Sequence, residues 1–198
     1  MKKQINIRLL VLIAITLLVG IWRIFQSSKG MGVMANFTPI GAMALFGGAY
    51  FINKGRAFLF PLLTLFISDI FLIQTVYAEH STGIMYEGWY FTYVAFAIMV
   101  LIGSKLIKKV SFKSVILSAL VAGLAHFIIG NFGVWLGGGL NITTGLPYTR
   151  NFSGLIMCYT LAIPFFKNML AGNLIYSAIL FGGFELAQSK FSVLRLTT

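Results

Sequence analysis

The chain has 198 residues, of which 59% are hydrophobic and only 10% are charged. Soluble domains are roughly half apolar and one quarter charged, so this composition excludes an ordinary soluble protein. The net charge of +11 does not indicate nucleic acid, because the positive residues lie in short loops between apolar runs. In such loops they set membrane topology and contact anionic lipid. We therefore expect the lipid bilayer, and no nucleic acid, as a partner.

The apolar runs predict an all-α membrane protein, a bundle of about six transmembrane helices in a single domain, 1–198. A helix needs about 20 apolar residues to cross a bilayer. The second run is short and rich in glycine and alanine, so we expect it to pack inside the bundle, where small residues allow close helix contact. The expected spans are 7–25, 39–52, 57–76, 89–107, 115–135 and 168–186.

A long connection, 140–164, is expected between the last two spans, because Gly137, Gly138 and Gly139 end the fifth. The apolar piece 155–166 within and just beyond it fits either a half-helix or an interfacial segment. A helix of this length reaches only about 18 Å, so the piece is too short to cross the membrane. Six spans are therefore favoured over seven.

The distribution of Lys and Arg predicts the orientation of the bundle. Of the fifteen, only Arg23, Lys29, Arg150 and Lys167 fall on one side of the expected membrane, and the other eleven fall on the opposite side. Positive residues favour the cytoplasm, so both termini are expected inside the cell. The first run is flanked by Arg8 and Arg23 and no small-residue cleavage site follows it, which favours a membrane span over a signal peptide.

Ionisable side chains are rare inside membrane spans and usually mark a function. Asp69 and His126 lie at similar expected depths, about 18 Å from the cytoplasmic edge at 1.5 Å per residue. The same estimate of depth places Tyr93 and Asn173 at nearly the same level in the membrane. We expect these four side chains to line a polar chamber that opens outward above an apolar floor. Alternatively, Asp69 pairs structurally with His126 or binds backbone groups at an irregular helix end.

Further polar and aromatic residues cluster at the expected outer ends of the spans. His80, Asn131, Trp135 and Arg150 are candidates to complete a ligand site, since aromatic rings with amides and one arginine suit a flat, polar molecule, either neutral or anionic. The competing interpretation is an interfacial belt of aromatic residues, as membrane proteins commonly have.

Catalytic and metal-binding motifs do not occur in the sequence. It has no phosphate-binding Walker loop, no His-Glu-x-x-His motif and no Gly-x-Ser-x-Gly elbow. The single cysteine, Cys158, excludes an internal disulfide and has no adjacent base. We expect no enzyme activity, no metal site and no cofactor.

Several strings resemble a family of bacterial membrane proteins described as transport proteins. That family in turn resembles the substrate-binding (S) components of energy-coupling-factor vitamin transporters. The resemblance covers most of the chain, 36–184, and is carried by the strings at 36–49, 68–69, 131–136, 162–168 and 172–174.

The resemblance implies a multi-pass protein of the bacterial cytoplasmic membrane that binds a vitamin or related nutrient near the outer face. It also implies a transmembrane coupling protein with ATPases as partners. The chain departs from that pattern, because its first helix lacks the Ala-x-x-x-Ala coupling motif and the nearest small-residue pair is Ala44 and Gly48. A solitary cobalamin transporter of the same broad fold class adds a corrinoid as a possible ligand, with His80 or His126 on the cobalt.

Three functions follow as hypotheses. The first is uptake of a small nutrient bound in the outward-facing chamber. The second is a membrane scaffold or assembly protein, which predicts that the layer of Asp69 is packed shut. The third, an intramembrane enzyme, would need a nucleophile or metal site that the sequence does not display.

Overall fold

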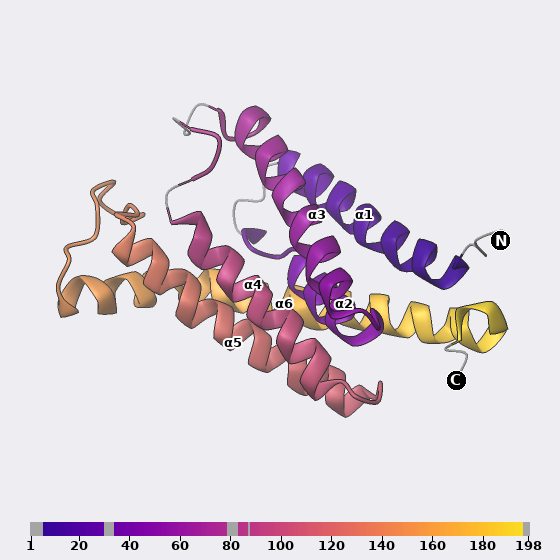
Figure 1. Cartoon of the computed structure of the whole chain (residues 1–198). Helices are drawn as coiled ribbons and strands as arrows, with labels where there is room; N and C mark the ends of the chain where they lie inside the picture. Colours follow the sequence, from indigo (N-terminus) through magenta and orange to yellow (C-terminus); the bar gives the residue numbers. More distant parts are fainter. Residues whose placement is uncertain (1–5, 30–33, 79–82, 87, 196–198) are drawn as a thin grey trace.

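A computed structural model of the chain describes residues 6–29, 34–78, 83–86 and 88–195. The regular elements of these ranges are helical (Figure 1): α1 (Ile7–Ser28), α2 (Ile40–Tyr50), α3 (Lys54–Thr75), α4 (Trp89–Leu106), α5 (Phe112–Leu136), α6 (Phe152–Lys190) and the 3-10 helix η3 (Ser192–Leu194).

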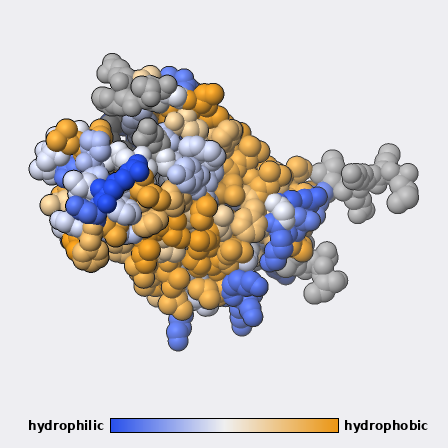
Figure 2. Space-filling model, turned by 60° about the vertical axis from the view of Figure 1, so that its left-hand side comes forward, coloured by the Kyte–Doolittle hydropathy of each residue, from blue (hydrophilic) through white to orange (hydrophobic). Residues whose placement is uncertain are grey.

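Five of the six described α-helices, all except α2, are long and apolar enough to cross a membrane. Their exposed faces form the broad hydrophobic surface of Figure 2, with hydrophilic residues gathered at its edges. The predicted class, an all-α membrane bundle, is confirmed. We call the end where α3 and α5 begin the basic end, and the opposite end, where α1 and α3 stop, the loop end.

Side-chain caps fix where several helices begin. The side chain of Asn53 accepts a hydrogen bond at the start of α3, and Ser111 forms a capping box with Ser114 at the start of α5. Asn151 accepts from the backbone N–H of Gly154 at 2.8 Å and starts α6. Each cap satisfies a backbone donor that has no partner within the helix.

The short helix α2 lies inside the bundle, and every residue of it except Ala49 is buried. It approaches α4 closely through glycines on both helices. A Cβ atom on Gly48 would lie 2.1 Å from the carbonyl oxygen of Val100, and one on Gly103 would lie 2.3 Å from that of Leu45. The expectation that small residues bury this segment is confirmed, because only glycine leaves room for such contact.

Helix α2 fills only the half of the bundle interior nearer the basic end. Its 11 residues extend about 16 Å, half of a bilayer core. The preceding segment, 34–39, is not α-helical, so its backbone needs other partners inside the bundle. The side chain of Gln26 donates to the carbonyl of Phe37 at 2.7 Å, and that of Asn168 donates to the carbonyl of Ala35 at 2.9 Å.

The expected break before the last span is wrong. Helix α6 is one continuous helix of 39 residues, which includes both the apolar piece 155–166 and the predicted span 168–186. It passes through Pro164 and packs along α5, where the hydroxyl of Tyr159 donates to the carbonyl of Ile128 at 2.6 Å. Its length of about 58 Å is nearly twice the thickness of a bilayer core.

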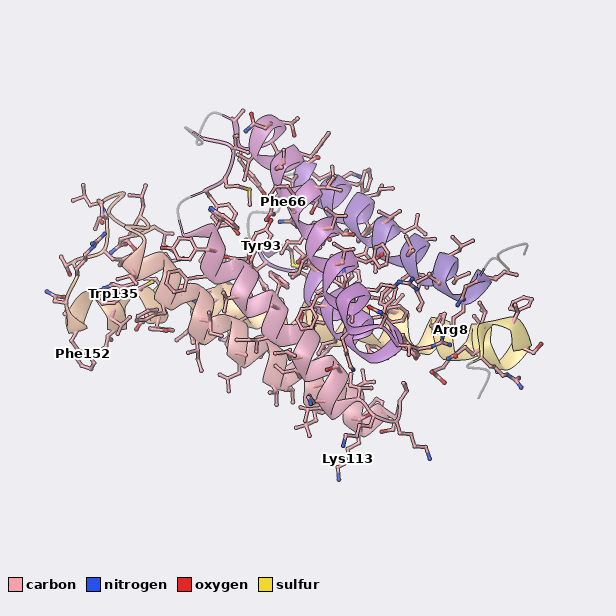
Figure 3. All side chains as sticks on the ribbon, in the orientation of Figure 1. Arg8, Phe66, Tyr93, Lys113, Trp135 and Phe152 are labelled. Atoms are coloured by element: carbon pink, nitrogen blue, oxygen red, sulfur yellow. The ribbon has the colours of Figure 1, made fainter. Side chains whose placement is uncertain are left out.

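A cluster of polar side chains joins several helices at the basic end. Arg8, which flanks the first apolar run on its cytoplasmic side, is buried. It lies near α6 (Figure 3) and donates to Gln188 at 2.7 Å and to the carbonyl of Leu194. The hydroxyl of Tyr50 donates to Glu185 at 2.6 Å in the same cluster. These contacts join α1, α2, α6 and η3, and they lie at the opposite end of the bundle from Asp69.

Candidate functional site

Asp69 is the centre of a hydrogen-bonded cluster between α1, α3 and α4. Its Oδ1 accepts from Nη2 of Arg23 at 2.5 Å, and its Oδ2 accepts from the hydroxyl of Tyr93 at 2.9 Å. Nη1 of Arg23 also donates to the hydroxyl of Ser68 at 2.5 Å. Figure 3 shows Tyr93 on α4 beside Phe66 of α3. Both carboxylate oxygens have partners, which a buried charge requires.

The proposed structural pairing of Asp69 with His126 is wrong, because Arg23 is the charged partner. Helices α1 and α3 pack along each other and bring Arg23 to the carboxylate. His126 instead stacks edge-on against Phe96, with ring centroids 5.1 Å apart. None of the described residues forms a hydrogen bond with its imidazole.

A cavity of about 490 Å³ lies between the helices at the level of Asp69. This cavity, which we call the chamber, contradicts the packed layer that the scaffold hypothesis predicts. Its volume is in the range of small-molecule pockets. Polar side chains along its wall include Arg23, Asp69, Tyr86, Thr92, His126 and Asn131, which come from α1, α3, α4, α5 and the loop before α4.

The chamber exists because α2 stops short. Where a longer α2 would fill the bundle, the segment 34–39, which is not α-helical, forms one wall through Asn36 and Thr38. Asn36 has a φ of 68°, a left-handed conformation that asparagine adopts more readily than most residues. Below this wall, Ile40 lines the chamber and Met43 is buried in the apolar core, as expected for the floor.

The charges on the chamber wall cancel. Arg23 and Asp69 are the only Lys, Arg, Asp or Glu residues among the described lining residues, and they form an ion pair. Burial of the phenol and the nearby charge of Asp69 raise the pKa of Tyr86 to about 12, so this tyrosine is neutral at physiological pH. The chamber therefore offers neutral hydrogen-bonding groups between aromatic walls rather than a net charge.

The structure brings only part of the predicted site together. Asn131 lines the chamber while its Nδ2 donates to the carbonyl of Phe127 at 2.7 Å. Trp135 donates instead to the carbonyl of Thr149 at 2.9 Å and so fastens the connection between α5 and α6. Arg150 is exposed and is not among the residues of the chamber wall.

Two further candidates fall outside the chamber wall. Asn173 is buried where α2, α5 and α6 meet, with its Oδ1 directed at Gly41 and its Nδ2 near the carbonyl of Ala119. It is a packing residue in the core rather than part of the predicted layer. His80 lies outside the described residues.

The sequence interpretation missed Arg23 as a site residue. It was assigned to the membrane surface because it stands near the end of an apolar run. The carboxylate of Asp69 could have revealed Arg23, because a buried charge needs a counter-charge at a similar depth. The contribution of Asn36 and Thr38 was missed as well, because nothing in the sequence marks that segment as part of the interior.

These features define a multi-pass helical membrane protein with an internal polar chamber. The chain belongs to a family of unknown function, DUF6580, whose model matches residues 3–194. No curated protein and no solved structure matches the chain.

Proposed function

We propose that the protein binds a small, uncharged polar nutrient in the chamber and takes it up across the cytoplasmic membrane of a bacterium. The observation that carries this proposal is a chamber of about 490 Å³ in which the charged side chains of the described wall, Arg23 and Asp69, neutralise each other. Burying polar groups around an empty space is costly in a membrane protein unless a ligand or water uses them.

The chemistry of the wall indicates how a ligand is held. His126 and Thr92 line the chamber with hydrogen-bonding groups, and the side-chain oxygen of Asn131 accepts a hydrogen bond from none of the described residues. Phe96 and Phe127 supply flat apolar surfaces for a ring. This arrangement suits an uncharged vitamin or precursor. A whole corrinoid is larger than the chamber, so it fits less well.

Two arguments from the sequence support uptake. The excess of Lys and Arg at the basic end favours the cytoplasm there, which turns the loop end and the chamber outward. The resemblance to S components favours a substrate-binding component that works with a coupling protein and ATPases. The absent Ala-x-x-x-Ala motif leaves a solitary transporter as the second form of the same function.

Ligand-induced thermal stabilisation tests the proposal. The purified full chain is melted with a panel of vitamins, vitamin precursors and corrinoids, and at least one uncharged compound is expected to raise the melting temperature. His126→Leu and Asn131→Leu are expected to weaken binding about tenfold each, because each removes one hydrogen bond from a buried ligand. Arg150→Gln, the matched control outside the chamber, is expected to bind normally. The proposal fails if no compound in the panel shifts the melting temperature.

A further inference from the structure

A second cavity lies on the outer surface of α5 and α6. This groove has a volume of about 670 Å³ and is formed by the side chains of Phe127 and of one face of α6, from Phe152 to Lys167. Its wall is almost entirely apolar. Phe152 is 75% exposed and Ile163 is 43% exposed, so the groove faces away from the bundle. On an apolar helix of a membrane bundle, that direction is toward lipid.

The groove and the chamber lie back to back. Phe127 and Phe166 line both cavities, and their rings pack with centroids 4.6 Å apart. Tyr159 packs on Phe127 with a ring-centroid distance of 5.4 Å. The hydrogen bond from the Tyr159 hydroxyl to the carbonyl of Ile128 holds the ring of Tyr159 in place. One layer of aromatic rings therefore separates the polar chamber from an apolar groove.

We propose that chamber and groove form one binding site for an amphiphile with an uncharged polar head and a hydrocarbon tail. The head occupies the chamber and the tail lies in the groove, passing beside Phe127 and Phe166. This inference rests on the proposed function and specifies the class of ligand. An uncharged head matches the cancelled charges of Arg23 and Asp69, and a hydrocarbon tail matches the apolar groove wall.

The size of the groove supports a tail rather than a passing contact with bulk lipid. Each buried methylene favours binding by about a factor of four, so several in contact with the wall give a selective affinity. The groove also shares two wall residues with the chamber, Phe127 and Phe166, so a ligand that displaces these two rings reaches both cavities. An amphiphile bound here would enter the chamber sideways from the bilayer.

A photoreactive probe tests this arrangement. The purified full chain is reconstituted in vesicles with a hexadecanol that carries a diazirine and an alkyne, illuminated, digested and mapped by mass spectrometry. Labelling is expected on the stretch 152–167 of α6. Three variants place the same large side chain on one helix. Ile163→Trp fills the groove, Leu161→Trp narrows the chamber, and Ile179→Trp is the control, at an exposed position outside both cavities.

The proposal predicts that I163W and L161W each lower labelling of this stretch about tenfold, and that I179W leaves it unchanged. Absence of labelling at 152–167 overturns it. If I163W abolishes the labelling but L161W leaves it unchanged, the probe binds the groove only as an annular lipid, and this result also overturns the proposal. Melting curves verify folding, and if L161W does not fold, Thr92→Phe narrows the chamber from α4 instead.

A further result separates this inference from the proposed function. If a compound without a hydrocarbon tail stabilises the wild-type protein and I163W equally, the chamber is a binding site that does not use the groove. The amphiphile is then rejected, while nutrient binding in the chamber stands. If neither the panel nor the probe binds, both proposals are rejected together.

Discussion

Removing Arg23 tests whether the ion pair is the central electrostatic feature of the bundle. In Arg23→Met the carboxylate of Asp69, whose side chain is 4% exposed, retains the hydroxyl of Tyr93 as its one side-chain partner among the described residues. Removing one member of a buried pair costs about 3–5 kcal/mol, because the other charge stays buried. The adjoining chamber can hydrate the carboxylate in part, so we expect the lower end of this range, about 3 kcal/mol.

A second substitution distinguishes a lost ion pair from lost packing. In the double variant Arg23→Met with Asp69→Leu no buried charge remains in this cluster, and stability is expected to return to within about 1 kcal/mol of the wild type. Arg150→Met is the matched control, because Arg150 is exposed, and it should change stability by less than about 0.5 kcal/mol.

Thermal unfolding followed by tryptophan fluorescence in a mild detergent measures these differences. For a chain of this length 1 kcal/mol corresponds to roughly 2–4 °C, so R23M is expected to melt about 6–12 °C below the wild type. The reasoning is refuted if R23M melts with the wild type. It is also refuted if the double variant is as unstable as R23M, since unpaired charge is then not the cause.

Three further predictions concern the packing that creates the chamber. Gly48→Ala should destabilise the protein by at least about 2 kcal/mol, because its methyl group would meet the carbonyl of Val100. Gly183→Ala is the matched control, since nothing lies within 4 Å of that position, and it should stabilise α6 by up to about 1 kcal/mol. Asn151→Ala should cost about 1 kcal/mol through loss of the α6 cap, seen as a lower melting temperature and faster proteolysis before α6. Gln26→Leu should cost about 1 kcal/mol and speed hydrogen exchange in the segment 34–39, because the partly buried carbonyl of Phe37 loses its donor. Unchanged exchange there would contradict this role.

The chamber and the core differ in how readily the sequence reveals them. Asp69 and His126 stand out because a charged or titratable group inside an apolar run is rare, and the structure places both on the chamber wall. Asn173 has the same signature in sequence yet is a buried packing residue, because its helix face turns toward Gly41 of α2. Depth follows from counting residues along a helix, but the direction of a side chain depends on how that helix is rotated in the bundle.

The hydropathy runs and the small residues of 40–50 determined from sequence alone that this is a helical membrane bundle with one short helix inside it. Only the tertiary structure decided that Arg23 is the partner of Asp69, that α6 continues through Pro164, and that Arg150 lies away from the chamber. The physical reason is that the length of an apolar run and the small size of its residues are properties of one local stretch of the chain. Ion pairing and cavity formation depend on which helix faces meet, and no single stretch of sequence contains that information.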